Sequence, residues 1–314
     1  MRTKIVRNIF ISVGLLFALT GPLAADKPQP TIITFDAPGA VATFGVGINP
    51  AGVIAGGYVD ANNVLHGYVR APDGTFTTYE APDAGTGPGQ GTGPNGINTA
   101  GDITGNVTDA SNVTHGYVRA KDGTITNFDA PGATVAFGTV GFDINPAGVI
   151  AGIWGDSNMV HGFVRAKDGT ITEFDPPGSI GTFMVNGPCI NPAGLIVGVY
   201  VDANFVAHGF VRAPDGAITT IDVPGAGTLP GLGNDARGIN PEGTIEGTYA
   251  DPSIVIHGYV RAANGIITTF DAPGAGTGPG QGTATFSGVT NPAGATTGSY
   301  IDSSNVFHGF LRTP

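Results

Sequence analysis

One five-residue motif recurs six times along this chain: His, Gly, Tyr or Phe, Val or Leu, and then Arg. Successive motifs lie 46 to 51 residues apart and contain every histidine of the 314-residue sequence. A fixed period of that length indicates one supersecondary unit copied along the chain, in which each copy buries its apolar surface against the next. The motif histidines are His66, His115, His161, His208, His257 and His308.

Each repeat predicts four short strands. In the first repeat, a strand ending at Asn49 enters the turn Asn-Pro-Ala-Gly, whose residue order is typical of a type I turn. Further strands are expected over residues 53–60, 66–71 and 75–80, with Asp-Gly in the hairpin between the last two. The 53 glycines and 24 prolines recur at fixed places, so they indicate turns of an all-β repeat rather than disorder.

Four antiparallel strands in about 47 residues match one blade of a β-propeller. The sequence therefore predicts an all-β fold, a six-bladed β-propeller of four-stranded antiparallel blades. Residues 31–36 resemble a fourth strand without a blade before it, and residues 306–312 resemble a third strand without a fourth after it. Pairing of these two segments would complete the last blade and close the ring, which removes the open sheet edges.

Residues 1–25 are predicted to be a secretory signal peptide. Three basic residues precede an apolar run over residues 9–19, and the small residues Ala24 and Ala25 follow. The apolar run is too short to span a bilayer. We expect residues 26–314 to form a single propeller domain, monomeric, without membrane insertion, and secreted to the periplasm or the extracellular space.

The charge balance disfavours nucleic acid as a partner. The formal net charge is −11, and loss of the leader would remove three of the 13 basic residues. Such an acidic surface repels phosphate backbones and anionic membranes. The single cysteine, Cys189, excludes an intrachain disulfide, and it is predicted to be a small buried residue because other repeats have Gly there.

An Asp precedes each motif histidine by six residues, or by five in the third repeat. If Asp60 and His66 face each other across a hairpin, alternation places Tyr58 opposite Tyr68. Six near-identical copies favour a structural hydrogen-bond clamp between blades over a metal site or a catalytic dyad, which remain as alternatives. The predicted clamp comprises Asp60, His66, Arg70, Asp109, His115, Arg119, Asp156, His161, Arg165, Asp202, His208, Arg212, Asp251, His257, Arg261, Asp302, His308 and Arg312.

Other recurring polar groups are also predicted to be structural. The motif arginines are expected to pair with fourth-strand carboxylates such as Asp36 or Asp129, because a buried guanidinium needs a partner. The Asp-rich loops between the second and third strands lack the acidic residue that ends a calcium loop, so Asx turns are the simpler explanation. Calcium remains an alternative, and no other cofactor is expected. The glycine pattern at residues 91–96 opens no predicted helix, which disfavours a phosphate site.

We expect the functional residues at positions where the six repeats differ in sequence. The segments that cross between blades and the loops between the second and third strands should share one face, at the mouth of an axial channel. Departures there include Asp143, Asp235 and Arg237, which are the candidate ligand-binding residues. A guanidinium beside a carboxylate can hold a sugar or an anion, although it can equally be a surface ion pair. No residue is assigned a catalytic role.

The run over residues 47–58, followed by His-Gly-Tyr-Val-Arg, resembles the HAF-type repeats of exported bacterial proteins. The resemblance covers nearly all of residues 26–314, although an aromatic residue follows His-Gly here where that family often has His-Ala-Phe. It implies export and a bacterial source, but no activity, because a fold alone confers none.

Two functions therefore remain open. The first is a secreted, non-catalytic binding or scaffold propeller that recognises a glycan, a peptide or a protein partner at the channel mouth. The alternative is a propeller enzyme, such as a lyase, a lactonase or a glycan hydrolase, with its site at the same mouth. The second hypothesis needs a cluster of titratable groups there, for which Asp143, Asp235 and Arg237 are the candidates.

Overall fold

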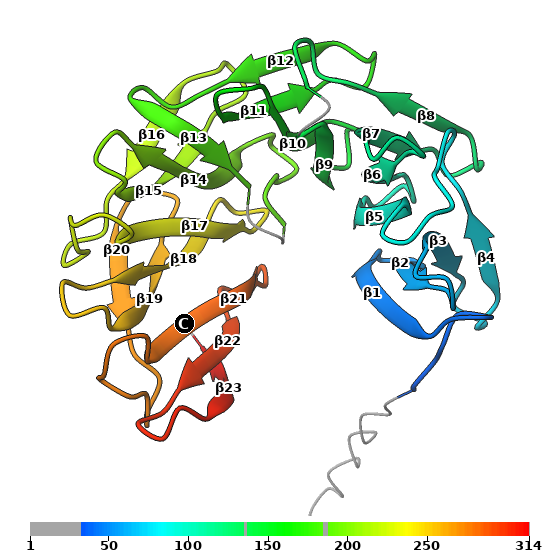
Figure 1. Cartoon of the computed structure of the whole chain (residues 1–314). Helices are drawn as coiled ribbons and strands as arrows, with labels where there is room; N and C mark the ends of the chain where they lie inside the picture. The colour runs from blue at the N-terminus through cyan, green and yellow to red at the C-terminus, as the bar shows by residue number, and fades with distance from the viewer. Residues whose placement is uncertain (1–32, 135–136, 185–187, 314) are drawn as a thin grey trace, which may run out of the picture. The chain divides into compact units, whose positions relative to one another are not determined.

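In the computed structural model of the chain, residues 33–134, 137–184 and 188–313 are described, with the backbone alone for residues 286–290. All secondary-structure elements assigned in these ranges are β-strands (Figure 1). Residues 36–314 form one unit, to which the following description refers. Within the described ranges, no helix is long and apolar enough to cross a membrane.

The strands follow the predicted order in each repeat. The first repeat contains β1 (Ala42–Ile48), β2 (Ile54–Val59), β3 (Leu65–Arg70) and β4 (Phe76–Tyr79). The later strands are β5 (Gly91–Ile97), β6 (Ile103–Thr108), β7 (Thr114–Arg119), β8 (Ile125–Phe128), β9 (Thr139–Ile144), β10 (Ile150–Gly155), β11 (Val160–Arg165), β12 (Ile171–Phe174), β13 (Ser179–Phe183), β14 (Ile196–Asp202), β15 (Ala207–Arg212), β16 (Ile218–Ile221), β17 (Gly233–Ile239), β18 (Ile245–Ala250), β19 (Ile256–Arg261), β20 (Ile267–Phe270), β21 (Gly282–Thr290), β22 (Thr296–Ile301) and β23 (Phe307–Arg312).

Strands within one repeat pair in the order first, second, third and fourth, and every pair is antiparallel. Single parallel bridges, such as Leu65 with Gly91, join some neighbouring repeats. The sheets are not closed: among the described residues, β23 pairs with β22 alone, and residues 33–36 form no strand. Thr31 and Ile32 lie outside the described residues. The all-β class is therefore confirmed, whereas the blade number and closure by the N-terminal segment stay predictions.

The predicted turn between the first and second strands is present. The side-chain Oδ1 of Asn49 accepts hydrogen bonds from the backbone N–H groups of Ala51 (3.0 Å) and Val53 (3.1 Å). Gly52 has a φ of 77°, a left-handed conformation that favours glycine. The same asparagines also link repeats, because the Nδ2 of one donates to the backbone carbonyl of the next. These donor and acceptor pairs are Asn98 to Asn145, Asn145 to Asn191, Asn191 to Asn240, and Asn240 to Asn291.

The glycine of each His-Gly pair makes room for a ring. A Cβ added to Gly67 would lie 2.5 Å from the ring of Tyr79 on β4. A second glycine, Gly56 on β2, lies opposite Tyr68, whose hydroxyl oxygen would be 2.3 Å from a Cβ at Gly56. Aromatic rings therefore cover glycines across the strands, and this requirement explains why the motif reads His-Gly-aromatic.

The same rings pack one repeat against the next, and we call this contact surface a seam. At the first seam, Tyr79 meets Tyr117 edge to face at 6.2 Å, with their hydroxyl oxygens 2.9 Å apart, and the Arg119 guanidinium lies 4.9 Å from the Tyr79 ring centre. Cation–π stacking of this kind compensates a guanidinium that is removed from water. Equivalent stacks join Arg165 to Phe128, Arg212 to Phe174 and Arg312 to Phe270. The expected pairing of an arginine with Asp129 was wrong, since Asp129 contacts His115.

Candidate functional site

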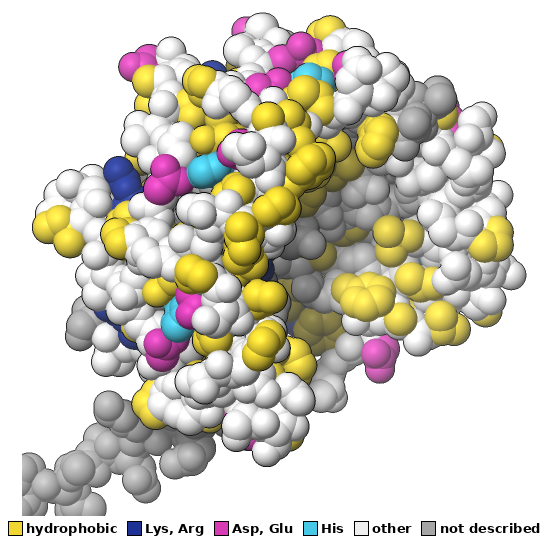
Figure 2. All heavy atoms as spheres, turned by 60° about the vertical axis from the view of Figure 1, so that its left-hand side comes forward, with side chains coloured by type: hydrophobic (Ala, Val, Ile, Leu, Met, Phe, Trp, Pro, Cys, Tyr) yellow, Lys and Arg dark blue, Asp and Glu magenta, His cyan; other side chains and the backbone are white. Residues whose placement is uncertain are grey.

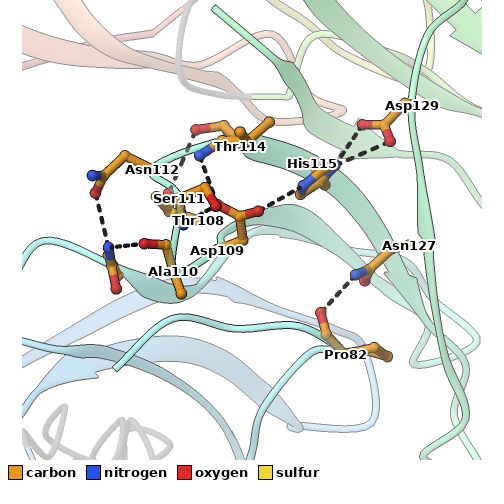
Figure 3. A network of polar contacts seen from close by, with 12 residues as sticks. Pro82, Thr108, Asp109, Ala110, Ser111, Asn112, Thr114, His115, Asn127 and Asp129 are labelled. Carbon is orange, nitrogen blue, oxygen red and sulfur yellow. Dashed lines mark hydrogen bonds and ion pairs between the residues drawn. The ribbon is translucent and has the colours of Figure 1, made fainter. Parts of the chain in front are cut away.

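In each of the first five repeats, the motif histidine lies between two carboxylates. In the second repeat, the Nδ1 of His115 lies 2.9 Å from Asp129 at the end of β8, and its Nε2 lies 3.7 Å from Asp109 (Figure 3). Both ring nitrogens therefore face acidic oxygens. The imidazole thus joins the loop before β7 to the residue that follows β8.

The predicted register between the second and third strands was wrong by two residues. His66 lies opposite Tyr58, not opposite Asp60, and stacks on the Tyr58 ring at 4.7 Å between centres. Asp60 stands at the strand end, where its Oδ1 accepts the backbone N–H groups of Asn62 (2.9 Å) and Val64 (2.8 Å). The Val64 hydrogen bond is the main cause that lowers the pKa of the Asp60 carboxyl.

These loops are thus Asx turns, in which one carboxylate oxygen is already bound to the backbone. Among the residues that the structure describes, no three His, Cys, Asp or Glu side chains are grouped so as to hold a metal ion.

The second carboxylate was missed by the sequence reasoning, although a constant interval of 14 residues marks it. The pairs through the histidine Nδ1 are His66 with Glu80, His115 with Asp129, His161 with Asp175, His208 with Asp222, and His257 with Asp271. Figure 2 shows histidines of this kind next to acidic side chains on the surface. In the sixth repeat, the Nε2 of His308 lies 3.2 Å from Asp302.

Asp143, the first candidate ligand residue, is a partly buried residue of β9. Its oxygens accept the backbone N–H groups of Ile144 (2.8 Å) and, in the next repeat, Ile190 (3.3 Å). Burial raises the pKa of the Asp143 carboxyl from 3.8 to about 6. Cys189 is buried as predicted, and burial raises the pKa of its thiol, which makes it a poor nucleophile.

Asp235 and Arg237, the other two candidates, lie together on β17 in the fifth repeat. The guanidinium donates to both carboxylate oxygens, at 3.0 Å from Nε and 2.6 Å from Nη2. Thr248 on β18 donates its backbone N–H and its hydroxyl to the same carboxylate, each at 2.9 Å. Arg237 stands at a β-bulge between Ala236 and Gly238, a feature that often redirects a side chain. The pair is therefore held rigidly by its own strand and the neighbouring one.

A cavity of about 230 Å³ opens beside Asp235. We call it the Asp235 cavity, and it lies at the ends of the strands where the crossing segment over residues 231–233 meets the fourth and fifth repeats. Its polar lining includes Asn234, Asp235 and Thr248, and Leu232 and Tyr249 contribute to its apolar wall. The structure thus places Asp235 and Arg237 together near a cavity, whereas the described hydrogen bonds of Asp143 are with its own repeat and the fourth.

Neither a family model nor a curated protein matches this chain. Among solved structures, it is similar to virginiamycin B lyase from Staphylococcus aureus, with 17% identity, a TM-score of 0.53, and coverage of 85% of this chain and 83% of that one. A catalytically inactive variant of that lyase with quinupristin gives 16% identity and a TM-score of 0.54 over the same shares of both chains. Puromycin hydrolase gives 13% identity and a TM-score of 0.53 over 87% of this chain and 45% of that one.

These neighbours are β-propeller proteins, so the likeness supports a propeller fold for this chain. At identities of 13–17%, the likeness concerns the fold alone. The chain spans less than half the length of puromycin hydrolase.

Proposed function

We propose that this protein is a secreted, non-catalytic binding propeller that recognises a hydroxyl-rich ligand, a glycan above all, at the Asp235 cavity. The observation that carries the proposal is the bidentate pair of Asp235 and Arg237 beside that cavity. A rigid carboxylate accepts hydrogen bonds from sugar hydroxyls, and a neighbouring tyrosine such as Tyr249 offers an apolar wall. Peptide and protein partners are the other ligands that the site could serve.

The repeated histidines support a binding role over catalysis. In the first five repeats, carboxylates face both nitrogens of each imidazole, and in the first, His66 also stacks on Tyr58. A catalytic site needs one distinct set of groups, whereas these sets recur from repeat to repeat.

We also propose that the ring has six blades and closes through residues 31–36. Leu311 on the edge strand β23 is 71% exposed, and among the described residues β23 pairs with β22 alone, so a further strand would cover this apolar side chain. Thr34-Phe35-Asp36 matches Thr78-Tyr79-Glu80 in sequence, so Asp36 would supply the carboxylate for the Nδ1 of His308.

Hydrogen exchange tests the closure. The amides of β23 should be protected in residues 26–314 and lose protection when residues 26–36 are deleted. Fast exchange of β23 in the longer chain would contradict closure by this segment.

Export and membership of the HAF-type repeat family are part of the same proposal, and they rest on the leader and the repeat sequence. Mass spectrometry of protein recovered from outside the cytoplasm should find a chain that begins near Asp26. Recovery of the intact leader from the cytoplasm would contradict export.

A propeller enzyme is the second candidate function, and Asp143 is the observation that favours it. A carboxyl group with a pKa of about 6 can donate and accept protons near neutral pH. Asp143, however, does not line the Asp235 cavity, and its oxygens accept backbone hydrogen bonds from Ile144 and Ile190, so the binding role is better supported.

A glycan array followed by titration calorimetry tests the binding role. The Asp235→Ala variant should bind the recognised glycan at least about tenfold more weakly, since it loses charge-assisted hydrogen bonds. Asp73→Ala is the matched control, because it removes a carboxylate from a hairpin tip in the first repeat and should leave affinity unchanged.

Two results would count against the proposal. If the Asp235→Ala variant binds the glycan as tightly as the wild type, the Asp235 cavity is not the binding site. If no glycan, peptide or protein ligand is found, the protein has no binding role of this kind. Turnover of a ligand that is lost in Asp143→Asn, while the fold is retained, would favour the enzyme instead.

A further inference from the structure

A second cavity, of about 330 Å³, lies between the fourth and fifth repeats, as the Asp235 cavity does, but at the opposite ends of their strands. It touches Ala213 just after β15 and Ile245 at the start of β18, whereas the Asp235 cavity touches Ala207 and Ala250 at the other strand ends. Its volume falls at the lower end of the range for small-molecule sites, which is about 300–1,000 Å³. We call it the Arg261 cavity.

The motif arginine in this cavity lacks the aromatic partner that the other seams provide. Arg119, Arg165 and Arg212 each stack on a ring from the fourth strand of the preceding repeat. The equivalent residue before Arg261 is Ile221, which is 2% exposed. Among the residues that the structure describes, none gives the Arg261 guanidinium a ring face, a hydrogen bond or an ion pair, and it lines the cavity instead.

Further departures from the repeat meet at the same place. Glu242 stands where all five other repeats have Ala, and it lines the cavity. Ala217 replaces the Thr of the first three repeats, and Ala263 replaces Pro or Lys at the hairpin tip. The replacements at 217 and 263 remove bulk from the lining, and the one at 242 adds a carboxylate. Glu242 and Arg261 do not form an ion pair with each other.

The lining thus offers one cation, one anion and an apolar wall. A guanidinium binds carboxylates through two parallel hydrogen bonds, and a carboxylate binds an ammonium group. Leu195, Val211 and Ile245 supply the apolar surface between the polar groups. A ligand that matches all three features is a zwitterion with an apolar side chain.

We propose that the Arg261 cavity binds an apolar α-amino acid, with its carboxylate on Arg261, its ammonium group on Glu242 and its side chain against Leu195, Val211 and Ile245. This site is separate from the Asp235 cavity and does not depend on the glycan proposal.

Titration calorimetry of residues 26–314 with L-phenylalanine and L-leucine tests the proposal. Two probes each lack one charge: 3-phenylpropionate has no ammonium group, and phenethylamine has no carboxylate. Both should bind at least about tenfold more weakly than L-phenylalanine, because each leaves one protein charge unpaired.

Variants identify the protein groups. Arg261→Gln should weaken L-phenylalanine binding at least about tenfold without lowering the melting temperature, because its guanidinium makes no stack to lose. Arg165→Gln is the matched control, since it loses the Phe128 stack and should melt earlier but bind normally. Glu242→Ala restores the residue of the other repeats, so it should keep the fold while it abolishes the preference for L-phenylalanine over 3-phenylpropionate.

No binding of either amino acid to the wild-type protein at millimolar concentration would overturn the proposal. Unchanged affinity in Arg261→Gln would overturn it as well, and equal binding of 3-phenylpropionate would remove the role of Glu242. Asp235→Ala should leave amino-acid binding intact, so failure here and failure of the glycan site can be told apart.

Discussion

Asp143 makes stability depend on pH in an unusual direction. Its carboxyl group lies between two repeats, and burial raises its pKa from 3.8 to about 6. A carboxyl whose pKa is higher in the folded state binds more protons there than in the unfolded chain. Its contribution to stability is therefore fully present below about pH 4 and is lost as the pH rises through about 6.

The size of the effect follows from the shift. Each pKa unit corresponds to about 1.36 kcal/mol, so a rise from 3.8 to about 6 gives at most about 3 kcal/mol. Partial exposure of the side chain reduces this value. Asp143→Asn keeps an oxygen for the Ile144 hydrogen bond but carries no charge. The variant should therefore gain stability over the wild type by about 1–3 kcal/mol at pH 8 and show little difference at pH 4.

Urea unfolding of both proteins between pH 4 and pH 8 measures this difference. Subtracting the two curves removes the titration of the other carboxylates, such as Asp60, whose lowered pKa acts at more acidic pH. A difference that stays constant across this range, or one that grows toward acid, would rule out a raised pKa of Asp143 in the folded protein.

Three further predictions concern the repeat itself, each read by urea unfolding. Gly162→Ala should lower the free energy of unfolding by at least about 1–3 kcal/mol through overpacking, because its Cβ would lie 2.6 Å from the Phe174 ring. The control Gly45→Ala, whose Cβ would have no atom within 4 Å, should change stability little, and equal losses in the two variants would contradict this packing. Phe174→Ile copies the natural residue Ile221 and should cost about 1–2.5 kcal/mol, since it loses a ring contact and a guanidinium stack; no loss would argue against the seam. His208→Ala should cost about 1–2 kcal/mol yet leave ligand binding unchanged, and calorimetry showing weaker binding would contradict its structural role.

Much of the strand order could be predicted because glycine, proline and asparagine mark the turns. The Asn49 turn has the predicted side-chain hydrogen bonds, and four-stranded antiparallel units follow from the repeat length. The register between β2 and β3 could not be fixed this way. Asp60 and His66 recur with a constant spacing that suggested a facing pair, but the Asx turn ends the strand at Asp60 and moves Tyr58 opposite His66.

Contacts between repeats were harder to predict than contacts within one. The stacks of motif arginines on rings, such as Arg119 on Tyr79, depend on how repeats pack, and a repeat pattern alone does not specify that packing. The candidate site was partly foreseen, because Asp235 and Arg237 depart from the repeat and do lie together. Arg261 could not be singled out, since it belongs to the motif and differs only because its neighbour across the seam is Ile221.

We propose that the recurring residues build the scaffold, whereas the residues that depart from the repeat in the fourth and fifth copies bind ligands. Residue-by-residue NMR during titration with the recognised glycan distinguishes the two groups of residues. The changes in chemical shift should be concentrated around Asn234, Asp235 and Thr248. Equal changes at the six His-Gly motifs, with none favoured, would contradict it.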